Sequence, residues 1–243
     1  MGGRVYAATG NGYFDANAGG DNYGDSVISL SADAVHFLGN YTPMNFTALQ
    51  DYDTDLGSTS PVMLPRQSAS RTPLVLAQGG KDQIFRLVDR AHLPGVAHEL
   101  QEISLDEALF STPAMWMDGA FRPWLFIGLS QRVEAYRFVT ESGRSTLVHI
   151  WTVSPGQTAS EGTSPVVSHG IVFVAFDNQI VALDAFNGRT LWSSAAPSAV
   201  RTIGTVHWQS PIVVDGWVYC ADQNGNLTAY SLPRTAREME FRE

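Results

Sequence analysis

Apolar and polar residues alternate along residues 180–192, and this pattern predicts a β-hairpin. From residue 180 to residue 184, even-numbered positions face one side of an extended chain and odd-numbered positions face the other. Asn187-Gly188 supplies the positive φ of a tight turn, and residues 190–192 return as a second strand. The carboxylate of Asp184 can cap the turn. Trp192 ends the hairpin and offers an apolar face to a neighbouring sheet.

A Ser-Pro or Thr-Pro pair recurs along the chain and marks a sequence repeat. Its prolines, which are spaced 52, 52 and 46 residues apart, are Pro61, Pro113, Pro165 and Pro211. A second marker is a small residue that ends an apolar strand and precedes a polar turn; it recurs at Ala77, Gly128, Ala175 and Ala221. The two markers agree on a period of about 48 residues, which is in the range of β-propeller blades.

Each period divides into four short strands. In the clearest copy we predict strands over 163–168, 171–176, 179–184 and 189–193. Pro165 is at a strand start, where a missing N–H is tolerated. The sequence therefore predicts an all-β fold, a β-propeller of about five four-stranded blades.

The blades are expected within one domain, 1–243, at about 1–45, 57–105, 108–156, 160–198 and 205–243. The first blade lacks its inner strand, because residues 1–45 contain only three strand patterns; we therefore expect the chain to begin part-way through a larger protein. A propeller must close or leave strand edges and apolar faces uncovered. Residues 234–243 could add a strand to the first blade and close a compact five-bladed ring, which we favour. Alternatively, the blades form an arc that missing sequence or another copy completes.

The formal net charge of −9 argues against nucleic acid and anionic membranes as partners. No basic stripe is present to replace the counterions of nucleic acid, and an anionic membrane surface is equally unsuitable. The sequence contains no run of about 18 apolar residues, so it does not predict membrane insertion. The single cysteine, Cys220, forms no internal disulfide and no cysteine framework for zinc.

The hairpin resembles a family motif. Ala182, Asp184, Gly188 and Trp192 match the A-x-D-x-x-x-G-x-x-x-W docking motif of quinoprotein-like (PQQ-like) β-propellers. In that superfamily the tryptophan of one blade packs on the next blade. Trp151 ends the third blade without the preceding Asp and Gly, and the fifth blade has no closing tryptophan.

The first two blades also resemble pyrroloquinoline-quinone (PQQ) dependent alcohol dehydrogenases. Thr9-Gly10-Asn11 is similar to their T-G-N, whose Asn is a calcium ligand, and Gly20-Asp21-Asn22 resembles the following G-D-N. The resemblance implies Asp55 as catalytic base and calcium ligand, Asn11 as calcium ligand and Lys81 as a contact of the quinone. The implied cofactors are PQQ and calcium. The family's calcium-binding Glu, stacking Trp and vicinal disulfide have no counterpart here, so we expect an incomplete quinone site.

Simpler interpretations of these residues stay open. Asn11-Gly12 is a common turn, Asp55 could cap a strand start, and Lys81 could be a solvated hairpin residue. The carboxylates of the glycine-rich loop, Asp15, Asp21 and Asp25, do not match the D-x-[DN]-x-[DN]-G calcium loop and are expected to be solvated.

We predict a binding or scaffold module that takes a small molecule or a protein at a propeller face and could form homo-oligomers through exposed blade edges. The first alternative is a PQQ- and calcium-dependent alcohol or polyol dehydrogenase, or a fragment of one. The second is a hydrolase that uses central-channel residues, for which His207, Trp208 and Trp116 are candidates. No G-x-S-x-G, H-E-x-x-H or P-loop motif supports it. The resemblance implies the periplasm or the outside of a bacterium.

Overall fold

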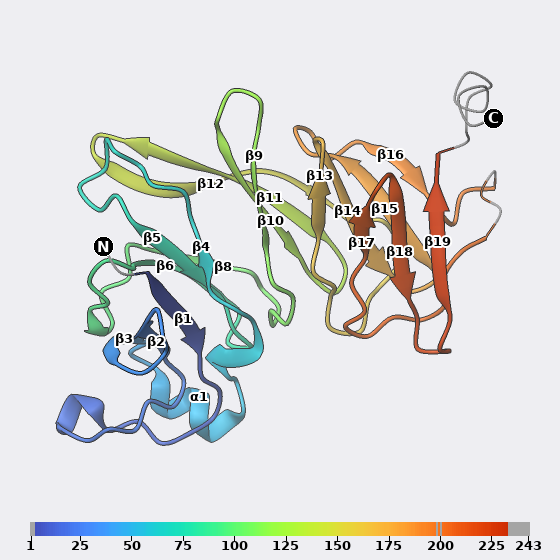
Figure 1. Cartoon of the computed structure of the whole chain (residues 1–243). Helices are drawn as coiled ribbons and strands as arrows, with labels where there is room; N and C mark the ends of the chain where they lie inside the picture. Colours follow the sequence, from blue (N-terminus) through green and yellow to red (C-terminus); the bar gives the residue numbers. More distant parts are fainter. Residues whose placement is uncertain (1–2, 198, 200, 233–243) are drawn as a thin grey trace.

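Five consecutive β-sheets make up the fold. The computed structural model describes residues 3–197, 199 and 201–232. Four sheets have four strands and the fifth has three, and they follow one another along the chain (Figure 1). The first sheet contains β1 (Arg4–Ala8), β2 (Val27–Ser31), β3 (Phe37–Thr42) and β7 (Gly95–Val96). The second contains β4 (Val62–Met63), β5 (Val75–Gln78), β6 (Ile84–Asp89) and β8 (Gln101–Ser104).

The other three sheets keep the chain order of their strands. The third contains β9 (Ala114–Met117), β10 (Pro123–Gly128), β11 (Val133–Glu141) and β12 (Arg144–Val153). The fourth contains β13 (Val166–Ser168), β14 (Ile171–Phe176), β15 (Gln179–Asp184) and β16 (Thr190–Ser193). The fifth contains β17 (Ile212–Val214), β18 (Trp217–Ala221) and β19 (Leu227–Ser231). The predicted hairpin is therefore β15 and β16, and the all-β, bladed fold is confirmed.

The sheets bury their apolar faces against one another. One core, which includes Val27 and Leu76, joins the first and second sheets, and another, which includes Leu87 and Leu125, joins the second and third. The largest core runs from the third sheet to the fifth and includes Phe126 and Val218. Strands with two neighbouring sheets, such as β10, are buried along their whole length. This layered burial is what a propeller requires of consecutive blades.

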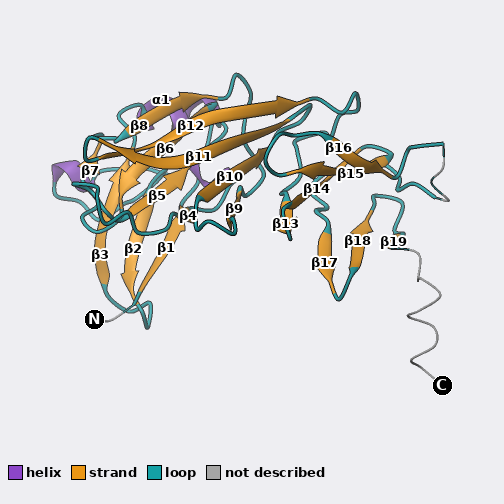
Figure 2. Ribbon diagram, turned by 90° about the horizontal axis from the view of Figure 1, so that it is seen from above, coloured by secondary structure: helices purple, strands orange, loops and turns teal. Residues whose placement is uncertain are grey.

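The described sheets do not close into the compact five-bladed ring that we favoured. The first and last sheets lie at opposite ends of an open arrangement (Figures 1 and 2). The first sheet takes its fourth strand, β7, from within the residues expected in the second blade, and β7 pairs in parallel with β3. In residues 3–232, so far as they are described, no strand pairs with the other edge of β1. Residues 234–243, to which we assigned ring closure, lie outside the described residues.

Three short helices were not predicted. These helices are η1 (Ala16–Ala18), α1 (Phe46–Tyr52) and η2 (Leu56–Ser58). Leu49 anchors α1 in the core between the first two sheets, and Asp53 ends the helix in the left-handed conformation with φ 55°. This ending places Asp53 and Asp55 on the short connection that leads into β4.

Candidate functional site

The three residues that the family resemblance selected meet at one end of the first two sheets. Asn11 follows β1, Asp55 precedes η2, and Lys81 is in the turn between β5 and β6. The Lys81 Nζ atom lies 2.7 Å from Asp55 Oδ2 and 3.3 Å from Asp53 Oδ1. Asp55 makes no capping hydrogen bond with its side chain, and the Lys81 side chain is only 22% exposed. Both side chains therefore belong to one ionic cluster, rather than to a helix cap and a solvated turn.

Backbone contacts hold the cluster in place. The Lys81 N–H donates to the carbonyl oxygen of Asp55 at 2.9 Å. A Cβ atom at Gly80 would lie 2.8 Å from the same oxygen, and a Cβ atom at Gly57 would lie 2.6 Å from the backbone nitrogen of Gly10. Glycine is needed at both positions because the connections between sheets cross so closely.

The side-chain amide of Asn11 contacts the two carboxylates. With its NH2 group turned toward them, it donates to Asp53 Oδ1 at 3.2 Å and to Asp55 Oδ2 at 3.3 Å. In the opposite orientation the NH2 group donates to the Gln50 carbonyl at 3.3 Å, and the amide oxygen faces Asp55. The first orientation satisfies both the amide and the carboxylates.

Asp25 is a further member of the site that the sequence did not identify. We expected a solvated loop carboxylate, but the side chain is fully buried. Its Oδ1 atom accepts a hydrogen bond from the Leu56 N–H at 3.0 Å, whereas no described residue donates to Oδ2. Burial raises the pKa of Asp25, and the nearby carboxylates of Asp55 and Asp82 raise it further. The hydrogen bond from Leu56 acts in the opposite direction and lowers it. The hint in the sequence was its place two residues before the apolar strand β2.

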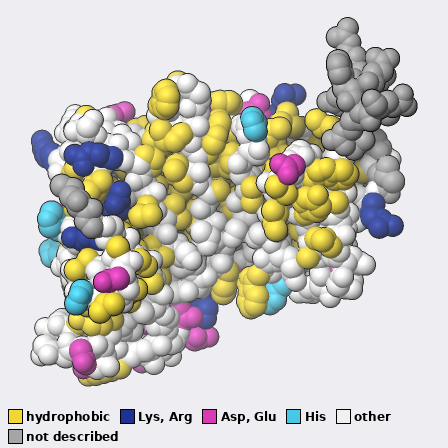
Figure 3. Space-filling model, viewed as in Figure 1, with side chains coloured by type: hydrophobic (Ala, Val, Ile, Leu, Met, Phe, Trp, Pro, Cys, Tyr) yellow, Lys and Arg dark blue, Asp and Glu magenta, His cyan; other side chains and the backbone are white. Residues whose placement is uncertain are grey.

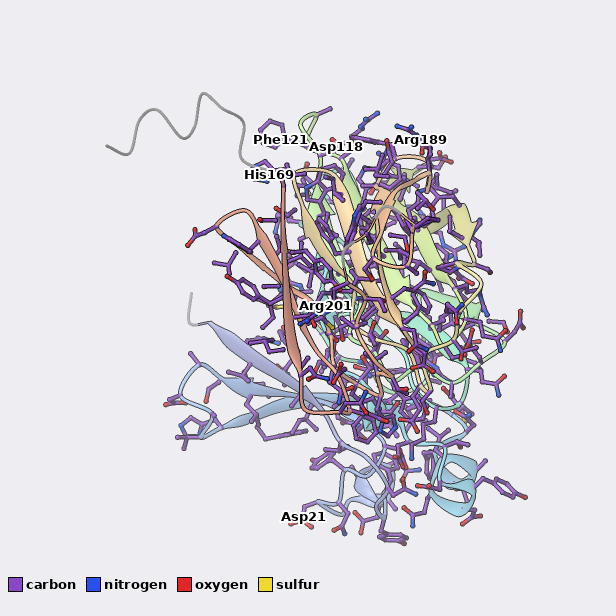
Figure 4. The ribbon with its side chains drawn as sticks, turned by 90° about the vertical axis from the view of Figure 1, so that its right-hand side faces the viewer. Asp21, Asp118, Phe121, His169, Arg189 and Arg201 are labelled. Atoms are coloured by element: carbon purple, nitrogen blue, oxygen red, sulfur yellow. The ribbon has the colours of Figure 1, made fainter. Side chains whose placement is uncertain are left out.

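The other loop carboxylates have different roles. Asp15 accepts hydrogen bonds from the backbone and side-chain nitrogens of Asn22 at 2.9 and 2.8 Å, so it closes the glycine-rich loop. Asp21 is exposed at the far end of that loop (Figure 4). Neither carboxylate joins the cluster around Asp55.

Lys81 is the positive member of the cluster. The hydrogen bond to Asp55 raises the pKa of Lys81, and Asp53 raises it further. The next residue, Asp82, is held away from Lys81 because both of its carboxylate oxygens accept hydrogen bonds from Arg86, which is 1% exposed. Lys81 is the only lysine of the chain, and it forms ion pairs with Asp55 and Asp53.

The donor set does not amount to a calcium site. Calcium takes six to eight oxygen ligands, and here Asn11, Asp53 and Asp55 supply oxygens beside a lysine ammonium. Among the described residues no group of three or more His, Cys, Asp or Glu side chains could hold a metal ion. The cluster can bind a polar group or hold a proton, but it does not by itself form a metal centre.

The candidate channel residues each contact their own neighbours. His207 Nε2 lies 3.0 Å from Glu161 Oε2, and the His207 ring stacks on Trp208 with centroids 3.9 Å apart. Trp116, on β9, packs edge-on against Phe186. Each candidate therefore has a packing or ion-pair role with its own neighbours.

Comparison with known proteins supports the fold. The family model of the outer membrane protein assembly factor BamB matches residues 141–238. No curated protein sequence matches the chain. No described helix has the length and apolar character needed to cross a membrane.

Three solved structures are similar to most of the chain. Sqt1 of Saccharomyces cerevisiae has a TM-score of 0.59 at 11% identity over 86% of this chain and 53% of its own. The quinohemoprotein alcohol dehydrogenase ADHIIG of Pseudomonas putida HK5 has a TM-score of 0.55 at 14% identity over 90% of this chain and 42% of its own. BBS1N, solved in complex with ARL6DN, has a TM-score of 0.51 at 10% identity over 86% of this chain and 58% of its own. The chain thus spans about half the length of these structures, and the matches identify its fold as a β-propeller. The family-model match over residues 141–238 supports its PQQ-like type.

Proposed function

We propose that the chain is a protein-binding module, and that it contacts its partner through the outer face of the last sheet. The observation that carries this proposal is the apolar character of that face. Ile212 is 62% exposed, Val214 49%, Trp217 39% and Leu227 70%. Figure 3 shows hydrophobic side chains gathered at the end of the molecule that the last sheet forms.

The two faces of the last sheet differ in what covers them. Val218 and Cys220 point to the inner face and are buried in the core shared with the fourth sheet. Val214 pairs with Trp217 and Ala221 pairs with Leu227, so these side chains share the outer face. No described residue buries that outer face as the next blade of a propeller would. An exposed apolar sheet face of this kind is a recognised mark of an interaction site.

A protein surface is the partner that fits this face. An apolar, aromatic patch is complemented by another apolar surface. Nucleic acid and anionic membranes are negatively charged and would be repelled by a chain of net charge −9. The similarity to BBS1N, which was solved with a protein partner, supports the use of this fold for protein binding. The BamB family match supports a role in the bacterial cell envelope, with the chain outside the cytoplasm.

Site-specific photocrosslinking tests the proposal. A benzophenone amino acid is placed at Leu227, and a control is placed at Tyr52, which is 77% exposed on α1 at the other end of the molecule. We expect a defined crosslinked product, with a partner protein or with a second copy, from position 227 only, and its loss when Trp217→Gln is added. Equal products from both positions, or none from position 227, would contradict the proposal.

The convergence of Asn11, Asp55 and Lys81 favours a second candidate, a calcium- and PQQ-dependent alcohol dehydrogenase or part of one. The residues present do not fit a complete site, because oxygen donors are few and no described strand closes the inner edge of β1 to enclose a quinone. The test is a melting experiment with calcium, PQQ and both together, followed by a dye-linked oxidation assay. A rise in Tm with both cofactors and alcohol oxidation that is lost in Asp55→Asn would establish this candidate.

A further inference from the structure

A cavity of about 580 Å³ lies between the beginning of β1 and the second sheet. Its walls include Arg4, Tyr6, Met63, Leu74, Arg90 and His92. Arg4 begins β1, whereas Asn11 follows the end of the same strand. Five strand residues span roughly 17 Å, so the cavity and the Asp55 cluster are at opposite ends of the strand.

Positive groups gather at this cavity in a chain whose net charge is negative. Arg4, Arg90 and His92 contribute to its walls, and none of the residues that line it is acidic. Neither arginine has a carboxylate oxygen within ion-pair distance among the described residues. Figure 3 shows Arg and His side chains gathered on this side of the molecule, beside the start of the chain.

Arg90 is half-buried and has one donor that no described group accepts. Its Nε atom is buried and donates to no described group. Leaving a buried charged donor without an acceptor is costly, and native structures rarely do so without a reason. The nearest acid along the chain, Asp89, accepts hydrogen bonds from the Ala91 and His92 N–H groups at 2.8 and 3.4 Å, so its carboxylate organises the turn.

The backbone around Arg90 is fixed before any ligand binds. The Tyr6 hydroxyl donates to the Arg90 carbonyl at 2.8 Å, and the Arg90 N–H donates to the Leu74 carbonyl at 3.0 Å. Arg4 Nη1 donates to the Ala91 carbonyl at 3.2 Å, which holds its guanidinium at the same wall. A site whose framework is already bound in place loses less conformational entropy when it takes a ligand.

We propose that this cavity binds an organic anion through carboxylate or phosphate oxygens. The guanidinium of Arg90 is the central contact, because a planar fork of N–H donors matches two oxygens of either group. Arg4 adds a second positive charge at the same wall. Met63, which is 53% exposed, and Leu74 provide an apolar wall for the hydrocarbon part of the ligand.

The test is calorimetric titration with phosphate and with citrate at constant ionic strength, which is kept by sodium chloride. We expect saturable binding of one of the two probes to the wild-type chain, and the probe that binds identifies phosphate or carboxylate as the recognised group. Arg90→Gln should weaken that binding by about ten- to hundredfold, since a hydrogen bond to a charged group is lost. Arg90→Lys keeps the positive charge but not the planar guanidinium donors, so its affinity should fall between those of the wild type and Arg90→Gln.

Arg189→Gln is the matched control. Arg189 is exposed on the turn before β16, in the fourth sheet (Figure 4), and it should bind the probe as the wild type does. A circular dichroism melt of each variant shows whether it is folded, and Arg4→Gln gives a second variant if Arg90→Gln unfolds. Equal affinities of the wild type and the folded Arg90 or Arg4 variants, or the absence of saturable binding by both probes, would overturn the proposal.

Discussion

The indole nitrogen of Trp151 donates a hydrogen bond to the carbonyl oxygen of Ala185, 3.1 Å away in the next sheet. The Trp151 ring lies directly over Gly188, where a Cβ atom would be 2.9 Å from two ring carbons and where φ is +72°. Only glycine suits that position, because of both the close ring and the positive φ. The Ala-x-Asp-x-x-x-Gly part of the hairpin therefore receives the tryptophan of the preceding sheet, although that sheet lacks the Asp and Gly of its own motif.

Trp151→Ala should destabilise the chain by about 3–5 kcal/mol, because a large side chain that is 7% exposed leaves a cavity between two sheets. Trp192→Ala is the comparison. Trp192 is half-buried and meets Tyr230 of the last sheet with ring centroids 5.0 Å apart, so its loss should cost clearly less. Urea unfolding followed by circular dichroism measures both. A smaller effect for Trp151 than for Trp192 would show that the indole contact with Ala185 and Gly188 does not hold the sheets together.

Thr163→Val should cost about 1–3 kcal/mol, because it removes a hydroxyl that pairs two buried backbone groups. Thr163 Oγ1 donates to the Ala175 carbonyl at 2.7 Å and accepts from the Ala175 N–H at 3.2 Å, and the residue is 1% exposed. Valine keeps the shape but leaves both partners unpaired. Thr152→Val, at an exposed position of β12, is the control and should change the free energy of unfolding by less than about 0.5 kcal/mol. Equal effects of the two substitutions would contradict this expectation.

The proline spacing predicted the sheets because it records physical contacts. The Thr112 N–H donates to Ser164 Oγ at 2.9 Å, and the Ser164 N–H donates to Ser210 Oγ at 2.9 Å. These residues precede the marker prolines and are separated by 52 and 46 positions, the same spacings as the prolines. The strand starts of successive blades are thus joined side by side, and a repeat in the sequence becomes a repeat of contacts.

Other features could not be predicted for equally physical reasons. Gly95-Val96 of β7 is too short to show alternation, and the pattern does not tell which sheet edge it joins. Strand counts also do not tell whether the first and last sheets meet, so the open arrangement was not predictable from them. A buried carboxylate such as Asp25 looks the same in sequence as a solvated one. The family resemblance selected Asn11, Asp55 and Lys81, and the structure brings them together, whereas their roles stay predictions.

Asp55→Asn should lower the pKa of Lys81, because the hydrogen bond to the Asp55 carboxylate is the largest cause of its rise. Lys81 is the only lysine, so reductive ¹³C-methylation gives one lysine signal beside that of the N-terminal amine, and its chemical shift can be followed against pH. Asp51→Asn is the control, because Asp51 is exposed and makes no ion pair with Lys81. An unchanged Lys81 pKa in Asp55→Asn would mean that the 2.7 Å contact does not persist in solution.

Asp25→Asn should stabilise the chain at pH 7 and leave it little changed at pH 4. Burial raises the pKa of Asp25, so the folded state favours the protonated form. The contribution of the protonated Asp25 to the free energy of unfolding is fully present below the carboxyl group's unfolded pKa of about 3.9. It is lost as pH rises through the higher folded pKa. Asparagine is always neutral, keeps an oxygen for the Leu56 N–H and tolerates the φ of 48° at this position.

Urea unfolding of the wild type and Asp25→Asn at several pH values measures this difference. The stability gap should open above pH 4 and reach its full size once Asp25 is ionised in the folded wild type. Asp21→Asn, on the exposed tip of the same loop, serves as the control and should show no such pH dependence. A gap that is constant with pH would assign the effect to packing rather than to the carboxylate charge.

Cys220 should react slowly with a thiol reagent in the native state. Burial raises the pKa of its thiol to about 11, and the residue is 1% exposed on the inner face of the last sheet. The thiolate is the reacting form, and an unfolded cysteine has a pKa of about 8.5, so the native rate at pH 8 should be at least about 100-fold below the rate in urea. Val213→Ala removes a partly buried side chain packed against the same core and should speed the reaction by loosening the sheet. Native reactivity equal to that of the unfolded chain would show that the fifth sheet does not stay packed on the fourth.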